Sequence, residues 1–146
     1  MILHAGLIAL RDQGVWRGVL LRGAAGSGKS DLMLRALAAG FRLVADDRAL
    51  VWRSGDALFG RAPETVRGLI ELRGLGVVRE EALPLSQIAL VVRCEAAGTV
   101  ERMPEAQFET HAGVVAPLLR IHALDASAPA KLGRALKRLG RGGGAA

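Results

Sequence analysis

The stretch from Gly23 to Ser30, which reads GAAGSGKS, restricts what this chain can fold into more than any other part of it. It matches the pattern G-x-x-x-x-G-K-S at every fixed position. The pattern predicts a loop whose backbone N–H groups surround a phosphate chain, with Lys29 reaching the terminal phosphates and Ser30 binding a magnesium ion. The candidate phosphate-binding residues are Gly23, Ala24, Ala25, Gly26, Ser27, Gly28, Lys29 and Ser30.

The sequence on both sides of this loop fits the motif. Val19–Leu21 is an apolar run typical of a buried strand, and residues 31–39 have the composition of a helix that stops at Gly40. An ordinary glycine-rich turn is the alternative, but it does not require a strand before it and a helix after it. The flanks therefore favour a phosphate site that is strengthened by the positive end of a helix.

Length and charge limit the classes of protein to consider. With 146 residues and 51% hydrophobic content, the chain has room for one domain with one core. The net charge of +6 comes mostly from the C-terminus, because residues 1–125 hold 15 basic and 14 acidic side chains. Aromatic residues make up only 3%. We therefore expect no nucleic-acid partner, and we interpret the basic C-terminal helix as a solvated face.

The single cysteine, Cys94, excludes an intramolecular disulfide, and its apolar neighbours predict a buried, inert thiol. No apolar run approaches the ~18 to 20 residues of a membrane span, and the N-terminus lacks the pattern of a signal peptide. These features predict a cytoplasmic protein with no membrane contact.

The apolar pattern predicts alternating strands and helices in a domain of residues 1–140, followed by a flexible tail at 141–146. The expected elements are a hairpin of Ile2–Leu10 with Val15–Leu21, a buried strand at Phe41–Ala45, a second hairpin of 50–52 with 57–59, a short helix within Glu64–Leu69, a central strand at Ile88–Val92, a strand region at Val114–Leu124 that is broken by Pro117, and a helix capped by Ser127 whose apolar stripe is Leu132, Leu136 and Leu139.

Two adjacent carboxylates, Asp46 and Asp47, directly follow the predicted strand Phe41–Ala45. Ligands of open α/β sheets bind at the carboxyl ends of strands. Beside a triphosphate, such acids bind metal or accept a proton from an attacking hydroxyl. An Asp-Asp pair is also a common polar start of a loop, but the phosphate loop one helix upstream favours a functional role.

Two further polar residues stay open on the pattern alone. His4 lies in an apolar segment, where a core histidine with a satisfied ring is the usual case. Glu71 lies in an apolar stretch and needs a partner if it is buried, for which Arg73 and a metal ion are the candidates.

The segments GAAGSGKSD, RLVADDR, GRAPETVRGLIELRGLGVV and ERMPE, taken in that order, resemble the catalytic domain of HPr kinase/phosphorylase. The resemblance covers nearly the whole chain. That family consists of bacterial serine kinases that act on HPr of the sugar phosphotransferase system. The resemblance implies a P-loop α/β fold like phosphoenolpyruvate carboxykinase, with a mixed central sheet and flanking helices. It also implies ATP and Mg²⁺ as cofactors, an HPr-type partner, a homo-oligomer that is a hexamer, and a short form without the N-terminal domain.

The resemblance also assigns roles to individual residues. His4 matches the family's histidine before the phosphate loop, which overrides its interpretation as a core residue. Lys29 and Ser30 match the loop lysine and the magnesium-binding serine, and Glu71 matches the second magnesium ligand. The proton acceptor lies in the aspartate pair, where we favour Asp47 with Asp46 supporting it. Arg102, in the segment ERM, matches a catalytic arginine.

The sequence departs from the family in ways that bear on the reaction. Ala25 stands where the family often has serine, which removes a hydroxyl from the loop. The segment Pro117–Pro129 does not match the basic segment that full-length members use for dephosphorylation. We therefore expect kinase activity with at most weak phosphorylase activity. A P-loop kinase of small molecules and a nucleotide-sensing module without phosphate transfer are the alternatives, and the aspartate pair argues against the sensor.

Overall fold

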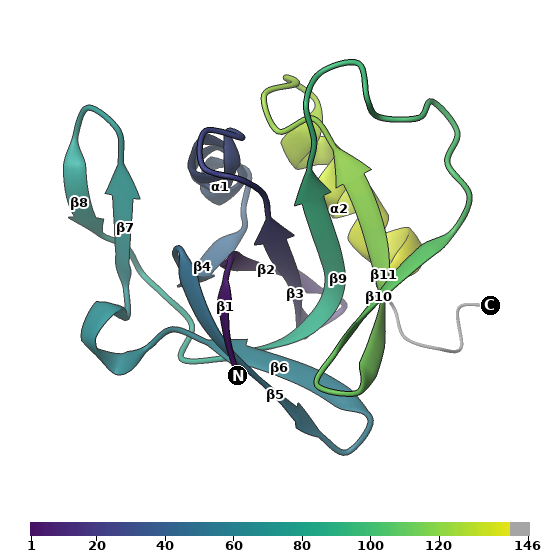
Figure 1. The fold of residues 1–146 in the computed structure, drawn as a ribbon. Helices are drawn as coiled ribbons and strands as arrows, with labels where there is room; N and C mark the ends of the chain where they lie inside the picture. The colour runs from purple at the N-terminus through teal and green to yellow at the C-terminus, as the bar shows by residue number, and fades with distance from the viewer. Residues whose placement is uncertain (141–146) are drawn as a thin grey trace.

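The computed structural model describes residues 1–140 and is built around one nine-stranded sheet (Figure 1). Seven strands form a continuous path in the order β1-β5-β6-β9-β3-β2-β4, and β10 and β11 extend the sheet from β9. The bounds of these strands are β1 Ile2–His4, β2 Gly6–Asp12, β3 Val15–Arg22, β4 Arg42–Ala45, β5 Arg48–Ser54, β6 Ala57–Arg61, β9 Ser86–Cys94, β10 Gln107–His111 and β11 Val114–Ile121.

Strand β9 is the branch point of the sheet. Its first residues pair with β6, where Gln87 faces Phe59. Its later residues pair in parallel with β11 from Val91 to Cys94, and also in parallel with β3. The remaining pairs, such as β2 with β3, are antiparallel. The expectation of a P-loop α/β fold with a mixed central sheet and flanking helices is therefore confirmed.

The curled sheet separates two apolar clusters. Helices α1, Lys29–Ala38, and α2, Ala128–Leu139, cover one face, and their buried residues pack against alternate residues of β3 and β9 (Figure 1). The other residues of these two strands face a second cluster, inside the curl, that β2, β5, β6 and β11 complete. The alternation of side chains along β3 and β9 thus serves two cores at once, which explains why both strands are almost continuously apolar.

Helix α1 begins and ends where the sequence predicts a phosphate loop and a glycine stop. Its N-cap is Gly28, in the left-handed conformation with φ of 87°. At its other end, Gly40 has φ of 103°, the N–H of Gly40 donates to the carbonyl of Leu37, and the N–H of Phe41 donates to the carbonyl of Ala36. This pair of bonds is a Schellman motif, which requires a residue that tolerates positive φ.

The predicted strand Ile2–Leu10 is wrong as a single element. It divides at Ala5 into β1, which pairs with β5, and β2, which pairs with both β3 and β4. At the point of division, the N–H of Ala5 donates a hydrogen bond to the carbonyl of Asp47, outside both strand pairs. Periodicity does not reveal this exchange of partners, because both halves are apolar and extended.

The expected break at Pro117 is also wrong, since β11 runs through it. Pro117 has no N–H to donate, but parallel pairing with β9 begins only at the next residue, Leu118. The proline therefore lies at a position where the strand edge that faces β9 needs no backbone donor.

The predicted helix at Glu64–Leu69 is only the 3₁₀ turn Glu64–Val66. After this turn, β7, Leu69–Leu72, pairs with β8, Gly76–Arg79, in a hairpin apart from the main sheet (Figure 1).

Three smaller expectations concern Cys94, the C-terminus and the membrane. The expected burial of Cys94 is confirmed, and burial raises the pKa of its thiol to about 11. The tail predicted at 141–146 lies outside the described residues. Within residues 1–140, neither helix has the length and apolar character needed to cross a bilayer.

The C-terminal helix provides a test of the helix-side core. Leu136 is fully buried, whereas Leu139, from the same predicted stripe, is 37% exposed. We expect Leu136→Ala to lower the free energy of unfolding by about 2–5 kcal/mol, because it leaves a cavity, and Leu139→Ala to lower it by less than about 1 kcal/mol. Urea unfolding of both variants measures the difference. Equal losses would contradict the placement of α2 on the sheet.

Candidate active site

The predicted phosphate loop connects β3 to α1. Gly26 and Gly28 have φ of 82° and 87°, and the N–H of Ser27 donates to the carbonyl of Ala24 at 3.0 Å. Successive N–H groups in such a left-handed turn point to one side and form a concavity for an anion. A Cβ added at Gly28 would lie 2.8 Å from a side-chain carbon of Leu124, so only glycine fits there.

The side chains of the loop fit a phosphate chain and a metal. The hydroxyl Oγ of Ser27 is buried without a hydrogen-bond partner among the described residues. Lys29 is half-buried and Ser30 is exposed, and both lie in the first turn of α1. The unused N–H groups of this turn add positive potential. The loop thus combines a hydroxyl that is unpaired within residues 1–140, a lysine and a helix N-terminus, which suits a polyphosphate.

His4 and Asp47 contact each other where β1 ends and β5 begins. Nε2 of His4 lies 3.2 Å from Oδ1 of Asp47, and both side chains are more than half exposed. The pairing of β1 with β5 brings them together. Asp47 has φ of 68°, in the left-handed region that aspartate adopts more readily than most residues with a side chain. The interpretation of His4 as a core histidine is therefore wrong.

Asp46 contacts the backbone of β7. Its Oδ2 accepts a hydrogen bond from the N–H of Glu71 at 2.9 Å. Burial raises the pKa of this carboxyl, and the charges of Asp47 and Glu71 add to the increase. The Glu71 N–H bond and the charge of Lys29 act in the opposite direction but do not cancel it. Asp46 therefore lies within the electrostatic range of both Lys29 and Asp47.

Glu71 is exposed on β7, so it is not the buried carboxylate that would need a partner. The structure records no ion pair between Glu71 and Arg73 in the described part of the chain. Residues 1–140 also hold no group of three His, Cys, Asp or Glu side chains close enough to bind a metal by themselves. A magnesium ion would therefore take the Ser30 hydroxyl, at most a few carboxylate oxygens and the phosphate oxygens as ligands, which suits Mg²⁺.

Arg102 is exposed in the loop between β9 and β10, away from the His4–Asp47 pair. It lines a polar hollow of about 370 Å³ together with His122, Asp125 and Lys131. The turn at 122–125 forms one wall of this hollow and also contacts Gly28 through Leu124. The hollow therefore adjoins the phosphate loop.

An arginine of α1 fixes this turn, and the sequence did not single it out. Arg35 donates through Nη1 to the carbonyl of Asp125 at 3.1 Å and through Nη2 to the carbonyl of Ala123. Its Nε also bonds Asp31, four residues earlier, at 2.8 Å. Helix α1 thus carries both the phosphate loop and the anchor of the turn that packs against it.

A family model described as the HPr Serine kinase C-terminal domain matches residues 2–105. The matched region contains the phosphate loop, both aspartates, Glu71 and Arg102. This chain belongs to the HPr serine kinase C-terminal domain family. The resemblance inferred from the motifs is therefore confirmed.

Individual relatives agree with this membership of the HPr kinase family. An HPr kinase/phosphorylase of Limosilactobacillus reuteri is 35% identical over 136 residues, which is 82% of this chain and 39% of the relative. One of Halalkalibacterium halodurans is 42% identical over 86 residues, which is 53% of this chain and 28% of the relative. The chain therefore spans well under half the length of these relatives.

A solved structure supports the fold of this HPr kinase domain. The Hpr(Ser) kinase/phosphatase from Coxiella burnetii superposes with a TM-score of 0.80 at 20% identity and covers 94% of this chain and 88% of that one. At this identity the likeness shows the fold alone.

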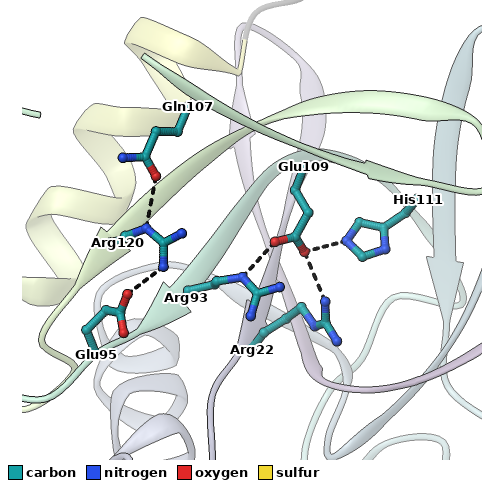
Figure 2. A network of polar contacts seen from close by, with 7 residues as sticks. All are labelled: Arg22, Arg93, Glu95, Gln107, Glu109, His111 and Arg120. Carbon is teal, nitrogen blue, oxygen red and sulfur yellow. Dashed lines mark hydrogen bonds and ion pairs between the residues drawn. The ribbon is translucent and has the colours of Figure 1, made fainter. Parts of the chain in front are cut away.

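The domain also contains a polar cluster that the sequence analysis missed (Figure 2). Glu109 on β10 is contacted by Arg22 at 3.0 Å, by Arg93 at 2.6 Å and by His111 at 2.6 Å. Burial of the Glu109 carboxyl acts to raise its pKa. The hydrogen bonds from Arg93, His111 and Arg22 outweigh that effect and lower the pKa from 4.5 to about 2. The sequence offers one signal for this cluster, which is that Arg22 and Arg93 both come near the ends of apolar strands.

The lowered pKa of Glu109 has a measurable consequence. Its ionised form stabilises the fold above the ordinary pKa of 4.5, and this contribution disappears as the pH falls toward about 2. We expect Glu109→Gln to lower the free energy of unfolding by on the order of 2 kcal/mol at about pH 6. The difference from the wild type should shrink as urea unfolding is repeated toward about pH 3. A difference that does not change with pH would show that Glu109 is not ionised in these contacts.

Proposed function

We propose that this chain is the catalytic unit of an ATP-dependent protein-serine kinase that phosphorylates an HPr-type phosphocarrier protein. One observation carries the proposal: Lys29 of the glycine-rich loop lies within electrostatic range of Asp46, and the adjacent Asp47 contacts a histidine. Family membership and the names of the relatives support the substrate class.

In the proposed reaction, the loop N–H groups and Lys29 hold the phosphates of ATP and offset their charge. Ser30 and Glu71 hold Mg²⁺, which neutralises charge between the phosphates when it is bound. Asp47 accepts the proton of the serine hydroxyl, and His4 orients its carboxylate. Asp46, which lies within the electrostatic range of both Lys29 and Asp47, assists Asp47 in this role. Arg102 offsets developing negative charge at the rim of the loop.

The geometry favours a kinase over a nucleotide sensor. A sensor needs the loop but no proton acceptor. Here an exposed aspartate contacts a histidine, and its neighbour Asp46 lies within electrostatic range of Lys29. Because both side chains are more than half exposed, they are accessible to a hydroxyl on a protein surface. That exposure also favours a protein substrate over a small molecule, which binds in an enclosed pocket.

We also propose that the reverse, phosphate-driven reaction is weak. Phosphorolysis brings inorganic phosphate against a phosphoserine, and these two anions repel each other strongly at close range. The segment Pro117–Pro129 contributes one arginine, Arg120, and its guanidinium contacts Glu95 and Gln107 instead of residues of the loop. The remaining proposals are a cytoplasmic setting, where ATP is available, and a homo-oligomer, a hexamer by resemblance.

The deciding experiment mixes the protein with magnesium, labelled ATP and an HPr-type protein, with Lys29→Ala as the control. We expect label on a serine of the partner and loss of transfer in the variant, which remains folded because Lys29 contacts ligand and not the core. The same partner, phosphorylated and incubated with phosphate, should release pyrophosphate much more slowly. Label on free metabolites, or transfer by Lys29→Ala, would contradict the proposal.

The two aspartates can be separated by matched variants. We expect Asp47→Asn to reduce kcat by about 10²–10⁴-fold, because the proton acceptor is lost, while nucleotide binding persists. Asp46→Asn should cost less, since an amide oxygen can still accept the Glu71 N–H bond. Steady-state kinetics and nucleotide titration of both variants provide the comparison. A larger loss in Asp46→Asn would move the role of proton acceptor to Asp46.

A further inference from the structure

Three arginines lie side by side on neighbouring parallel strands. In the register of the sheet, Arg22 of β3 pairs with Arg93 of β9, and Arg93 pairs with Arg120 of β11. Residues in register on adjacent strands point to the same face, so the three side chains form one row across the sheet, away from α1 and α2. We call Arg22, Arg93 and Arg120 the arginine row.

The arginine row carries more positive charge than its acidic partners neutralise. Glu109 contacts Arg22 and Arg93, and Glu95 contacts Arg120 at 2.5 Å (Figure 2). Three permanent positive charges thus face two carboxylates, while Gln107, the other partner of Arg120, is neutral. His111, which also contacts Glu109, adds no negative charge. Each arginine keeps a terminal nitrogen outside the bonds drawn in Figure 2.

The ion pairs with Glu109 and Glu95 hold this arrangement in the fold, but they leave one positive charge of the row without a carboxylate among residues 1–140. Like charges directly opposite on neighbouring strands are destabilising, and a row of three repeats that cost. The side chains of Arg93 and Arg120 are 40% and 43% exposed, so they do not fill the core either. A row that keeps an excess of positive charge and leaves Arg93 and Arg120 accessible is suited to an anion from outside the chain.

The position and shape of the row indicate what kind of anion. Arg22 directly precedes Gly23, the first residue of the phosphate loop, so the row begins at the active site. It then extends across three strands. Its members line neither the polar hollow near Arg102 nor a second groove, of about 580 Å³, that α2 lines with Arg138 and Leu139. A line of cations matches several carboxylates along a chain better than one phosphate.

We propose that the arginine row docks an acidic segment of the protein substrate and so positions that protein beside the phosphate loop. This inference rests on the proposed function for the identity of the substrate, but not for the interaction itself. The row supplies electrostatic attraction and orientation, while transfer depends on the loop and the aspartates.

A binding experiment tests the row without any assumption about the reaction. The probe is a fluorescein-labelled peptide of ten glutamates, followed by fluorescence anisotropy at low salt. We expect Arg93→Gln/Arg120→Gln to weaken binding about tenfold, as two exposed charge pairs are lost. The control Lys137→Gln/Arg138→Gln removes the same charge from the exposed face of α2 and should retain wild-type binding.

A kinetic experiment connects the row to the substrate. With an HPr-type protein, the double variant should raise the KM for that protein about tenfold and leave the KM for ATP unchanged. Added salt should raise the wild-type KM for the protein and affect the variant less. Because Arg93 also holds the largely buried Glu109, Arg120→Gln alone serves as the second variant if the double variant does not fold.

The outcomes separate the two proposals. Equal loss of peptide binding in the row variant and in the α2 control would show that only net charge matters and would overturn the inference. Unchanged peptide binding in the row variant would overturn it as well. Selective loss of peptide binding without any phosphorylation of HPr-type proteins would keep the docking surface and reject the proposed substrate.

Discussion

The parallel pairing of β3 with β9 is the constraint on which the rest of this structure depends. It aligns the carboxyl ends of two strands, so that the phosphate loop after β3 rises from the edge of a rigid sheet. Because β9 pairs with β6 at its start and with β11 at its end, the same strand also forces the sheet to curl. The helix-side core and the core inside the curl then meet across β3 and β9, and both are needed to hold the edge that carries the site.

The electrostatics of the site follow from this edge. On one side, a helix N-terminus, glycine N–H groups and Lys29 create a region of positive potential. On the other side, Asp46 and Asp47 follow β4 at the same end of the sheet, and burial raises the pKa of Asp46. The backbone thus holds the cationic groups apart from the aspartates instead of letting them form ion pairs. That separation leaves space for a ligand that carries both phosphates and a metal.

Membership of the HPr kinase family and the superposed structure agree on the architecture but leave individual roles to the residues of this chain. His4 contacts Asp47, and Lys29 lies within electrostatic range of Asp46, whereas Arg102 lines a hollow that the turn at 122–125 bounds. The candidate residues therefore fall into two groups, one on the edge of the sheet with the phosphate loop and one on the long loop between β9 and β10. The contacts of Arg35 with that turn connect them through α1.

The sequence by itself determined the phosphate loop, the helix after it, the glycine that ends that helix and the position of the aspartate pair, because each depends on short-range backbone chemistry. It did not determine that Ile2–Leu10 divides between two partners, that Pro117 lies within a continuous strand, or that His4 is exposed beside Asp47. Those features depend on which strands pair, and the energy of pairing comes from residues far apart in the chain. The arginine row is the clearest case, since Arg22, Arg93 and Arg120 become neighbours only through the register of three strands.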